Sequence, residues 1–133
     1  MDNIINDLLN YALDKGIGLI MTKELSPDTT SFADINRNRI VFNLNYKNKK
    51  QLAFQLAHEI KHFENGDKSN GVLYFTPRKN KVEFDANVGA IKMLFPYYMD
   101  GKERSQINIY NFMECFAIPS HLEPAVTKEF IEH

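Results

Sequence analysis

The sequence predicts an α+β protein, with its strands and most of its helices in separate parts of the chain. Three short segments with strand patterns lie together in the first half, after one helical segment, and helical patterns fill most of the rest. We expect a small three-stranded sheet, antiparallel or mixed, packed against several helices. A chain of 133 residues is long enough for one domain with its own core, so we expect a single domain over 1–133.

The first half of the chain contains the expected strands. Residues 3–15 place apolar side chains at helical spacing, and Gly16 is typical of a helix end. The segments expected to form strands are 17–22, 32–35 and 39–45. In the last of them, Ile40, Phe42 and Leu44 share one face, which is the period of two that a strand shows.

The second half begins with two long helical patterns. Residues 51–64 contain no Gly or Pro, and Asn65-Gly66-Asp67 is a good helix stop. The polar segment 66–80 is expected to be a loop. A second helix is expected from Lys81 to Phe95, where Pro96 should end it.

Two shorter helices are expected in the last third of the chain, at 103–117 and 120–131. Ser120 and Glu123 have the spacing of a capping box for the second of them. Cys115 lies in an apolar helical stretch, where a buried structural cysteine is expected rather than a catalytic thiol. Because it is the only cysteine, no internal disulfide can form, which fits a reducing cytoplasm.

Composition argues against two classes of partner. The formal net charge of −1 gives no electrostatic footprint for nucleic acid, so we expect no direct nucleic-acid binding. No apolar run approaches the length that spans a bilayer, and the N-terminus lacks a basic region followed by an apolar run. We therefore expect no membrane contact and a cytoplasmic location.

The pattern with the most chemical content is His58-Glu59-Ile60-Lys61-His62, an H-E-x-x-H. Positions four apart share one face of a helix, so His58 and His62 can offer imidazole nitrogens to one metal ion. Glu59 lies about 100° round the helix from His58, close enough to act as a base on a water at that metal. The alternative is a surface helix on which these three side chains are incidental.

A third metal ligand is expected from the helix after the loop. The nearby carboxylates are Glu64, Glu83 and Asp85, and Glu64 shares a helix face with neither histidine. Glu83 lies in the first turn of its helix, and Asn87 is one turn further on the same face. This spacing lets Glu83 bind metal while Asn87 hydrogen-bonds a ligand histidine from behind. We favour Glu83 over Asp85, for which the alternative is a solvated carboxylate near a helix N-terminus.

The two helices together resemble the ImmA/IrrE metallopeptidases. The family pattern is roughly A-H-E-L-x-H, followed by E-x-E-A-N-x-F-A-x-x-L-L-M-P. Here Ala57 precedes the H-E-x-x-H, and the second motif corresponds to Glu83-Phe-Asp-Ala-Asn87 and the residues up to Leu94-Phe95-Pro96. The resemblance covers about residues 17–96, and both motifs match in order and in spacing.

Three departures from the family pattern stand out. Asp85 replaces the second glutamate, Gly89 replaces the aromatic residue, and Ile60-Lys61 replaces the usual Leu-Gly. The last change places a long cation beside the site. The loss of the aromatic residue leaves a gap that another side chain must fill.

The resemblance implies a zincin-like fold and a cytoplasmic, Zn²⁺-dependent endopeptidase, with Mn²⁺ as the alternative metal. It implies that His58, His62 and Glu83 are the ligands and that Glu59 is the general base. It also implies a protein substrate, a helix-turn-helix repressor of the Xre/Cro type, whose cleavage derepresses phage, mobile-element or stress genes. The alternative is a metal-bound regulatory module that acts on a repressor by contact without cutting it.

Two features of substrate handling are open at this point. Strand 39–44 is a candidate edge strand that could hold an extended substrate by strand addition. The candidates for a partner of the oxyanion are Tyr74, Tyr97, Tyr98 and His121, and for each of them core packing or a surface position is the competing interpretation.

Overall fold

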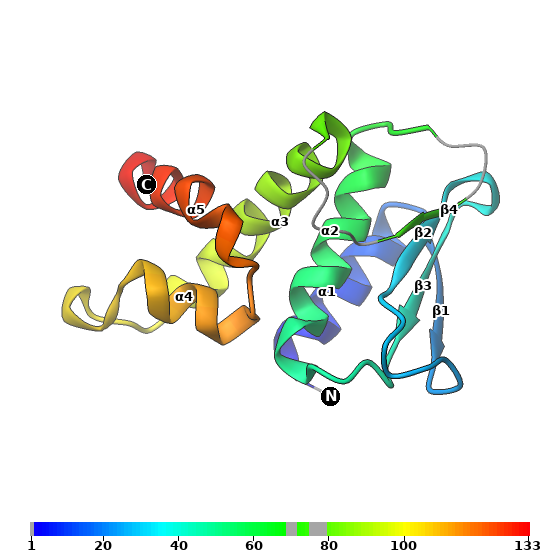
Figure 1. Cartoon of the computed structure of the whole chain (residues 1–133), viewed down its shortest axis with the longest axis horizontal. Coiled ribbons are helices and arrows are strands. Elements are labelled where there is room, and N and C mark those ends of the chain that lie inside the picture. The colour runs from blue at the N-terminus through cyan, green and yellow to red at the C-terminus, as the bar shows by residue number, and fades with distance from the viewer. Residues whose placement is uncertain (1, 69–71, 75–79) are drawn as a thin grey trace.

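The computed structural model describes residues 2–68, 72–74 and 80–133. Within these residues the chain forms five α-helices and four strands, which confirms the predicted α+β class (Figure 1). The helices are α1 (Asn3–Asp14), α2 (Leu52–Glu64), α3 (Lys81–Met99), α4 (Ile109–Phe116) and α5 (Glu123–Glu132). The strands are β1 (Gly18–Thr22), β2 (Phe32–Asp34), β3 (Arg39–Asn43) and β4 (Val72–Tyr74). None of the helices in the described part combines the length and apolarity that a membrane crossing requires.

The sheet is mixed, with strand order β1-β3-β2-β4, and has four strands where the sequence predicts three. β1 runs parallel to β3, and β2 runs antiparallel to both β3 and β4. The additional strand, β4, lies in the segment predicted to be a loop, of which residues 69–71 and 75–79 are outside the described part. Its pairing partner, β2, is about 40 residues earlier in the chain, so local patterning carries no signal for it.

The strand order also corrects the expectation about substrate binding. β3 has β1 on one side and β2 on the other, so residues 39–43 have no free edge. Among the described strands, β1 and β4 form the two edges of the sheet. Strand 39–44 therefore cannot accept an added strand.

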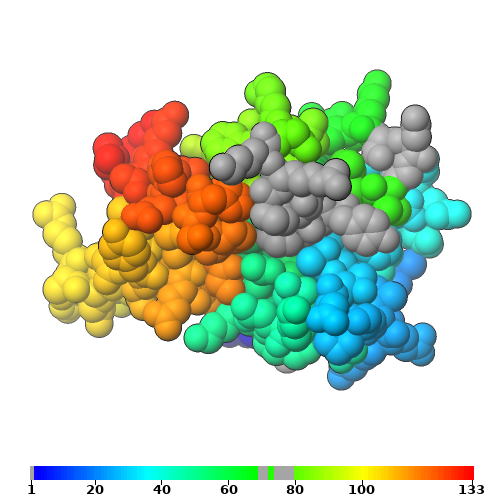
Figure 2. Space-filling view, viewed as in Figure 1, coloured from blue at the N-terminus to red at the C-terminus, as the bar shows by residue number. Residues whose placement is uncertain are grey.

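Helix α2 lies at the centre of the molecule. It contacts α1, α3 and α4, and it packs under β2 and β3. Ten of its 13 residues are buried. Figure 1 shows α1 and α2 beside the sheet, with α3, α4 and α5 on the other side of α2, and Figure 2 shows the strands and the α4–α5 part at opposite ends of the molecule. This burial rules out the surface-helix interpretation of the H-E-x-x-H.

Helix α3 is longer than predicted, because it continues through Pro96 to Met99. Proline removes one backbone donor, yet its carbonyl still accepts, here from the N–H of Asp100 at 3.1 Å. Ala86 and Ala90 on this helix are fully buried, as expected for small residues that let α3 pack closely on α2.

The C-terminal helices are shorter than predicted. The segments 103–117 and 120–131 each begin with a 3₁₀ turn, at Arg104–Gln106 and Ser120–Leu122, before α4 and α5 start. The predicted capping box does not form, because α5 has Leu122 as its N-cap, with no side-chain hydrogen bond.

Cys115 is exposed, which corrects the expectation of a buried cysteine. Phe112 and Phe116 occupy the buried face of α4, and Cys115 lies on the other side of the helix. Ile109 and Met113 are partly buried beside these two rings, so the core-facing side of this short helix does not include Cys115.

Candidate metal centre

Helices α2 and α3 bring three predicted ligands together. The Oε2 atom of Glu83 lies 3.0 Å from Nε2 of His58 and 3.1 Å from Nε2 of His62. The two histidine Nε2 atoms are 3.1 Å apart. In the described part of the chain these residues are the only group of three or more His, Cys, Asp or Glu side chains placed to share a metal ion, and all three are buried.

Both histidines are oriented from behind by an acceptor. Nδ1 of His58 lies 2.7 Å from Oδ1 of Asn87, and Nδ1 of His62 lies 2.9 Å from Oδ2 of Asp67. A neutral imidazole that donates from Nδ1 presents a lone pair at Nε2. In that tautomer each histidine presents an acceptor atom to the carboxylate of Glu83.

Three acceptor atoms about 3 Å apart repel one another unless a proton or a cation lies among them. Zinc bonds of about 2.0–2.1 Å in a tetrahedral arrangement place ligand atoms about 3.3 Å apart, close to the observed spacing. Two imidazoles and one carboxylate are also a usual protein ligand set of a catalytic zinc site. The donor set and its spacing fit a zinc-like ion.

The pKa values of the three groups reflect their mutual contacts. Burial alone would raise the pKa of Glu83, but hydrogen bonds from His58 and His62 outweigh it and lower the pKa to about 2. Burial lowers the pKa of His58 in spite of the nearby Glu83. Burial also opposes charge on His62, yet its hydrogen bonds to Glu83 and Asp67 raise its pKa overall. Glu83 is therefore held as a carboxylate, which is the form that binds a metal.

Glu59 is fully buried next to this group without being part of it. Its Oε1 atom is 4.0 Å from Nε2 of His62. Neither carboxylate oxygen has a hydrogen-bond partner among the described residues. Burial raises the pKa of Glu59 well above its usual range, and the charge of Glu83 raises it further, while the backbone of Ala33 opposes the shift. A buried carboxylate without partners costs stability, so its presence here is typical of a functional group.

The competing carboxylates lie elsewhere. Asp85 is exposed and pairs with Lys81 at 3.0 Å, so the alternative third ligand is excluded in this structure. Glu64 pairs with Lys61 at 2.8 Å and accepts a hydrogen bond from Tyr11. Of these three carboxylates, only Glu83 reaches the Nε2 atoms of the histidines.

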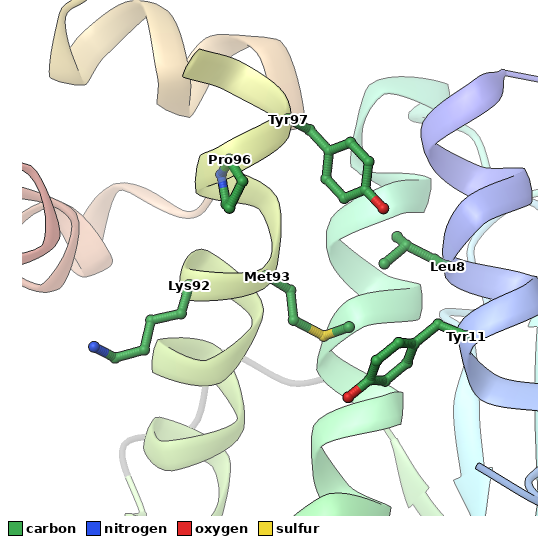
Figure 3. Close-up of a pocket in the computed structure, with 6 residues that line it drawn as sticks. All are labelled: Leu8, Tyr11, Lys92, Met93, Pro96 and Tyr97. Atoms are coloured by element: carbon green, nitrogen blue, oxygen red, sulfur yellow. The ribbon is translucent and has the colours of Figure 1, made fainter. Parts of the chain in front are cut away.

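Tyr98 and Tyr97, two of the candidates for an oxyanion partner, contact residues other than the proposed metal ligands. The hydroxyl of Tyr98 donates to Oδ1 of Asn111 at 2.8 Å, and its ring is buried in the core. Tyr97 points toward Leu8 and Tyr11 of α1 across a surface pocket of about 320 Å³ (Figure 3).

The remaining two candidates give no further support. His121 is exposed in the 3₁₀ turn before α5. Tyr74 ends β4, and its side chain lies outside the described part. The structure therefore assigns no oxyanion partner among Tyr97, Tyr98 and His121.

The sequence pattern does not predict a role for Asp67 at this site. It predicts Asp67 only as part of a helix stop, and a residue five positions after His62 would lie on another face if the helix continued. The signal lies in Gly66, since a glycine at a helix end turns the chain back toward the last turn of the helix.

Comparison with known proteins adds no relative: no family model, no curated protein and no solved structure matches this chain. The geometry of the site and the two helical motifs are therefore the basis on which a function can be assigned.

Proposed function

We propose that this protein is a metal-dependent endopeptidase with a zincin-like fold. The observation that carries the proposal is the buried carboxylate of Glu59, whose oxygens have no hydrogen-bond partner in the part of the chain that the structure describes, beside the three converging ligand atoms of His58, His62 and Glu83. A module that only bound metal would gain nothing from a carboxylate that costs stability and touches no ligand. The resemblance of both helices to the ImmA/IrrE pattern supports the same function.

His58, His62 and Glu83 would hold Zn²⁺, and Mn²⁺ is the alternative. The ion would supply Lewis-acid polarisation of a peptide carbonyl and make water a stronger nucleophile at neutral pH. The low pKa of Glu83 keeps this ligand ionised, and the hydrogen bonds of the two Nδ1 atoms to Asn87 and Asp67 orient the imidazoles, which bind a metal in their neutral form.

Glu59 would act as the general base and then as the general acid, once the charge of the bound cation offsets the burial that raises its pKa in the metal-free protein. Its carboxylate takes one proton from the attacking water as the new C–O bond forms at the scissile carbonyl. It then delivers that proton to the nitrogen of the departing amine as the C–N bond breaks. The protein ends the cycle with Glu59 ionised and water has been added across the peptide bond.

The proposed substrate is a helix-turn-helix repressor of the Xre/Cro type, encoded by a phage or mobile element. Cleavage would take place in the cytoplasm. This choice follows from the resemblance to the ImmA/IrrE family. The net charge of −1 is consistent with a protein that acts on a DNA-binding partner without binding DNA itself. The competing function is release of the repressor by contact, without cleavage.

The experiment is incubation of the zinc-loaded protein with a candidate helix-turn-helix repressor of the Xre/Cro type, in parallel with Glu59→Gln. The substitution keeps the size of the side chain and removes the base, so zinc content should remain near one equivalent. Cleavage, measured by mass spectrometry of the fragments, should fall by roughly 10²–10⁴-fold. Asp85→Asn is the matched control, because it neutralises an exposed carboxylate on the neighbouring helix and should cleave at the normal rate.

The two functions give opposite results in cells. A peptidase with Glu59→Gln should bind the repressor and leave its target genes repressed. If Glu59→Gln derepresses those genes as well as the wild type does, the protein acts by contact and the peptidase assignment is wrong.

A further inference from the structure

The end of α2 folds back over one of the proposed ligands. Gly66 adopts a left-handed conformation with φ +69°. Its N–H donates to the carbonyl of Phe63 at 3.1 Å, and the N–H of Asp67 donates to the carbonyl of His62 at 3.0 Å. These two bonds form a Schellman motif, in which the second residue beyond the helix cap returns to the last turn.

This turn brings the side chain of Asp67 to the imidazole of His62. Oδ2 of Asp67 is 2.9 Å from Nδ1 of His62, while Nε2 on the opposite side of the same ring is 3.1 Å from Oε2 of Glu83. The imidazole is fully buried, and the carboxylate of Asp67 is 15% exposed. Asp67 is therefore held to His62 twice, once through its backbone and once through its side chain.

We infer that Asp67 is a positioning residue for the metal centre, which orients His62 and fixes its tautomer so that the Nε2 lone pair faces Glu83 and His58. The inference rests on the proposed metal site. Hydrogen bonding of a ligand histidine to a carboxylate also makes the imidazole a stronger donor to the metal. Residues 62–67 in this way form both the helix cap and the support of one proposed ligand, His62.

The two histidines are supported unequally. Asn87 offers His58 a neutral amide oxygen, and Asp67 offers His62 a charged carboxylate. A charge-assisted hydrogen bond is about twice as strong as a neutral one, so His62 should be the more firmly oriented ligand. Removal of Asp67 should consequently affect metal binding at least as much as removal of Asn87.

A purely structural role for Asp67 makes a different prediction. The Schellman motif uses the backbone N–H of residue 67, which Asp67→Ala retains. If capping were the whole role, Asp67→Ala would leave both zinc affinity and the His62 tautomer unchanged. These two quantities therefore separate positioning from capping.

The experiment compares the wild type, Asp67→Ala, Asp67→Asn and Asn87→Ala. Zinc affinity is measured by equilibrium competition with a chromogenic chelator. The tautomer of each histidine is measured in the metal-free proteins at alkaline pH, by long-range ¹H–¹⁵N correlation of the ring nitrogens. Unfolding curves of the metal-free proteins show whether each variant is folded.

We expect Asp67→Ala to weaken zinc binding by roughly 10–100-fold, the effect usual for loss of such a partner. The His62 signal should move from the Nδ1–H tautomer toward a mixture, while the His58 signal stays unchanged. Asn87→Ala should show the converse pattern. Asp67→Asn keeps an acceptor oxygen, so it should retain the tautomer and lose less affinity than Asp67→Ala.

Zinc affinity within twofold of the wild type together with an unchanged His62 tautomer in Asp67→Ala would overturn the inference. If Asp67→Ala does not fold, Asp67→Asn decides: equal affinity to the wild type contradicts the role of the charge. Failure of the wild type to bind zinc would instead overturn the metal site itself, and the tautomer measurement would still test whether Asp67 orients His62.

Discussion

The aliphatic stem of Lys61 on α2 lies against Gly89 on α3. A Cβ atom placed on Gly89 would be 2.6 Å from Cγ and 2.7 Å from Cδ of Lys61, which is closer than atoms can approach. The ammonium group turns away to pair with Glu64 at 2.8 Å. The expected gap at Gly89 is thus filled by Lys61, and the cation is directed to Glu64 and not to the metal ligands.

This contact links two of the three differences from the ImmA/IrrE pattern, Lys61 and Gly89. A long side chain at 61 and the absence of one at 89 use the same space between α2 and α3. Because α2 carries His58 and His62 and α3 carries Glu83, the contact also helps to set the spacing of the ligands. Lys61 and Gly89 should therefore be energetically coupled.

The first prediction is that Gly89→Phe destabilises the protein by about 1–3 kcal/mol, through overpacking against Lys61. The double variant Lys61→Ala, Gly89→Phe should recover part of this loss, because the alanine vacates the space that the phenyl ring needs. Denaturant unfolding of the wild type, both single variants and the double variant gives the coupling energy. Simple additivity of the two single changes would show that the residues do not compete for space.

The second prediction is that zinc binding depends on Glu83 and not on Asp85, the other acidic residue near the start of α3. Glu83→Gln should lose zinc strongly, because it removes the anionic ligand that both histidines face. Asp85→Asn should retain about the wild-type zinc content, since the carboxylate is 46% exposed and its partner is Lys81. Elemental analysis of the dialysed proteins measures both, and the reverse order of losses would contradict the assigned ligand set.

The third prediction concerns the pH dependence of stability in the metal-free protein. The folded state raises the pKa of Glu59, so it holds that proton to higher pH than the unfolded chain does. The stabilising contribution of protonated Glu59 is complete below the unfolded pKa, near 4.5, and is lost as pH rises through the folded pKa. The contribution of Glu59 to wild-type stability should accordingly decline from mildly acidic toward alkaline pH.

Glu59→Gln removes this titration and the buried charge with it. At neutral pH and above, the variant should be more stable than the wild type by about 1 kcal/mol or more, with a flatter pH profile. Thermal unfolding across the pH range, after chelation of metal, provides the comparison. Equal stability of the two proteins at alkaline pH would show that Glu59 carries no burial penalty.

Helical periodicity in the chain predicts the parts of the site whose residues share one helix. His58, Glu59 and His62 lie within five consecutive positions of one helix, and Glu83 and Asn87 are one turn apart on another. Spacing within a helix is fixed by local backbone geometry, so the chain alone shows which side chains share a face. The α+β class was also predictable, because strand patterns and long helical patterns are local signals and lie in separate parts of the chain.

Which helices and strands contact one another cannot be predicted from these local patterns and is seen in the folded protein. The pairing of β3 with both β1 and β2 made β3 an interior strand, and the orientation of α4 on the core left Cys115 exposed. The left-handed Gly66 carried Asp67 back to His62, and packing of α2 under the sheet removed Glu59 from solvent. These features depend on contacts between segments or on the direction of the chain after a helix ends, and neither is encoded in the period of a single element.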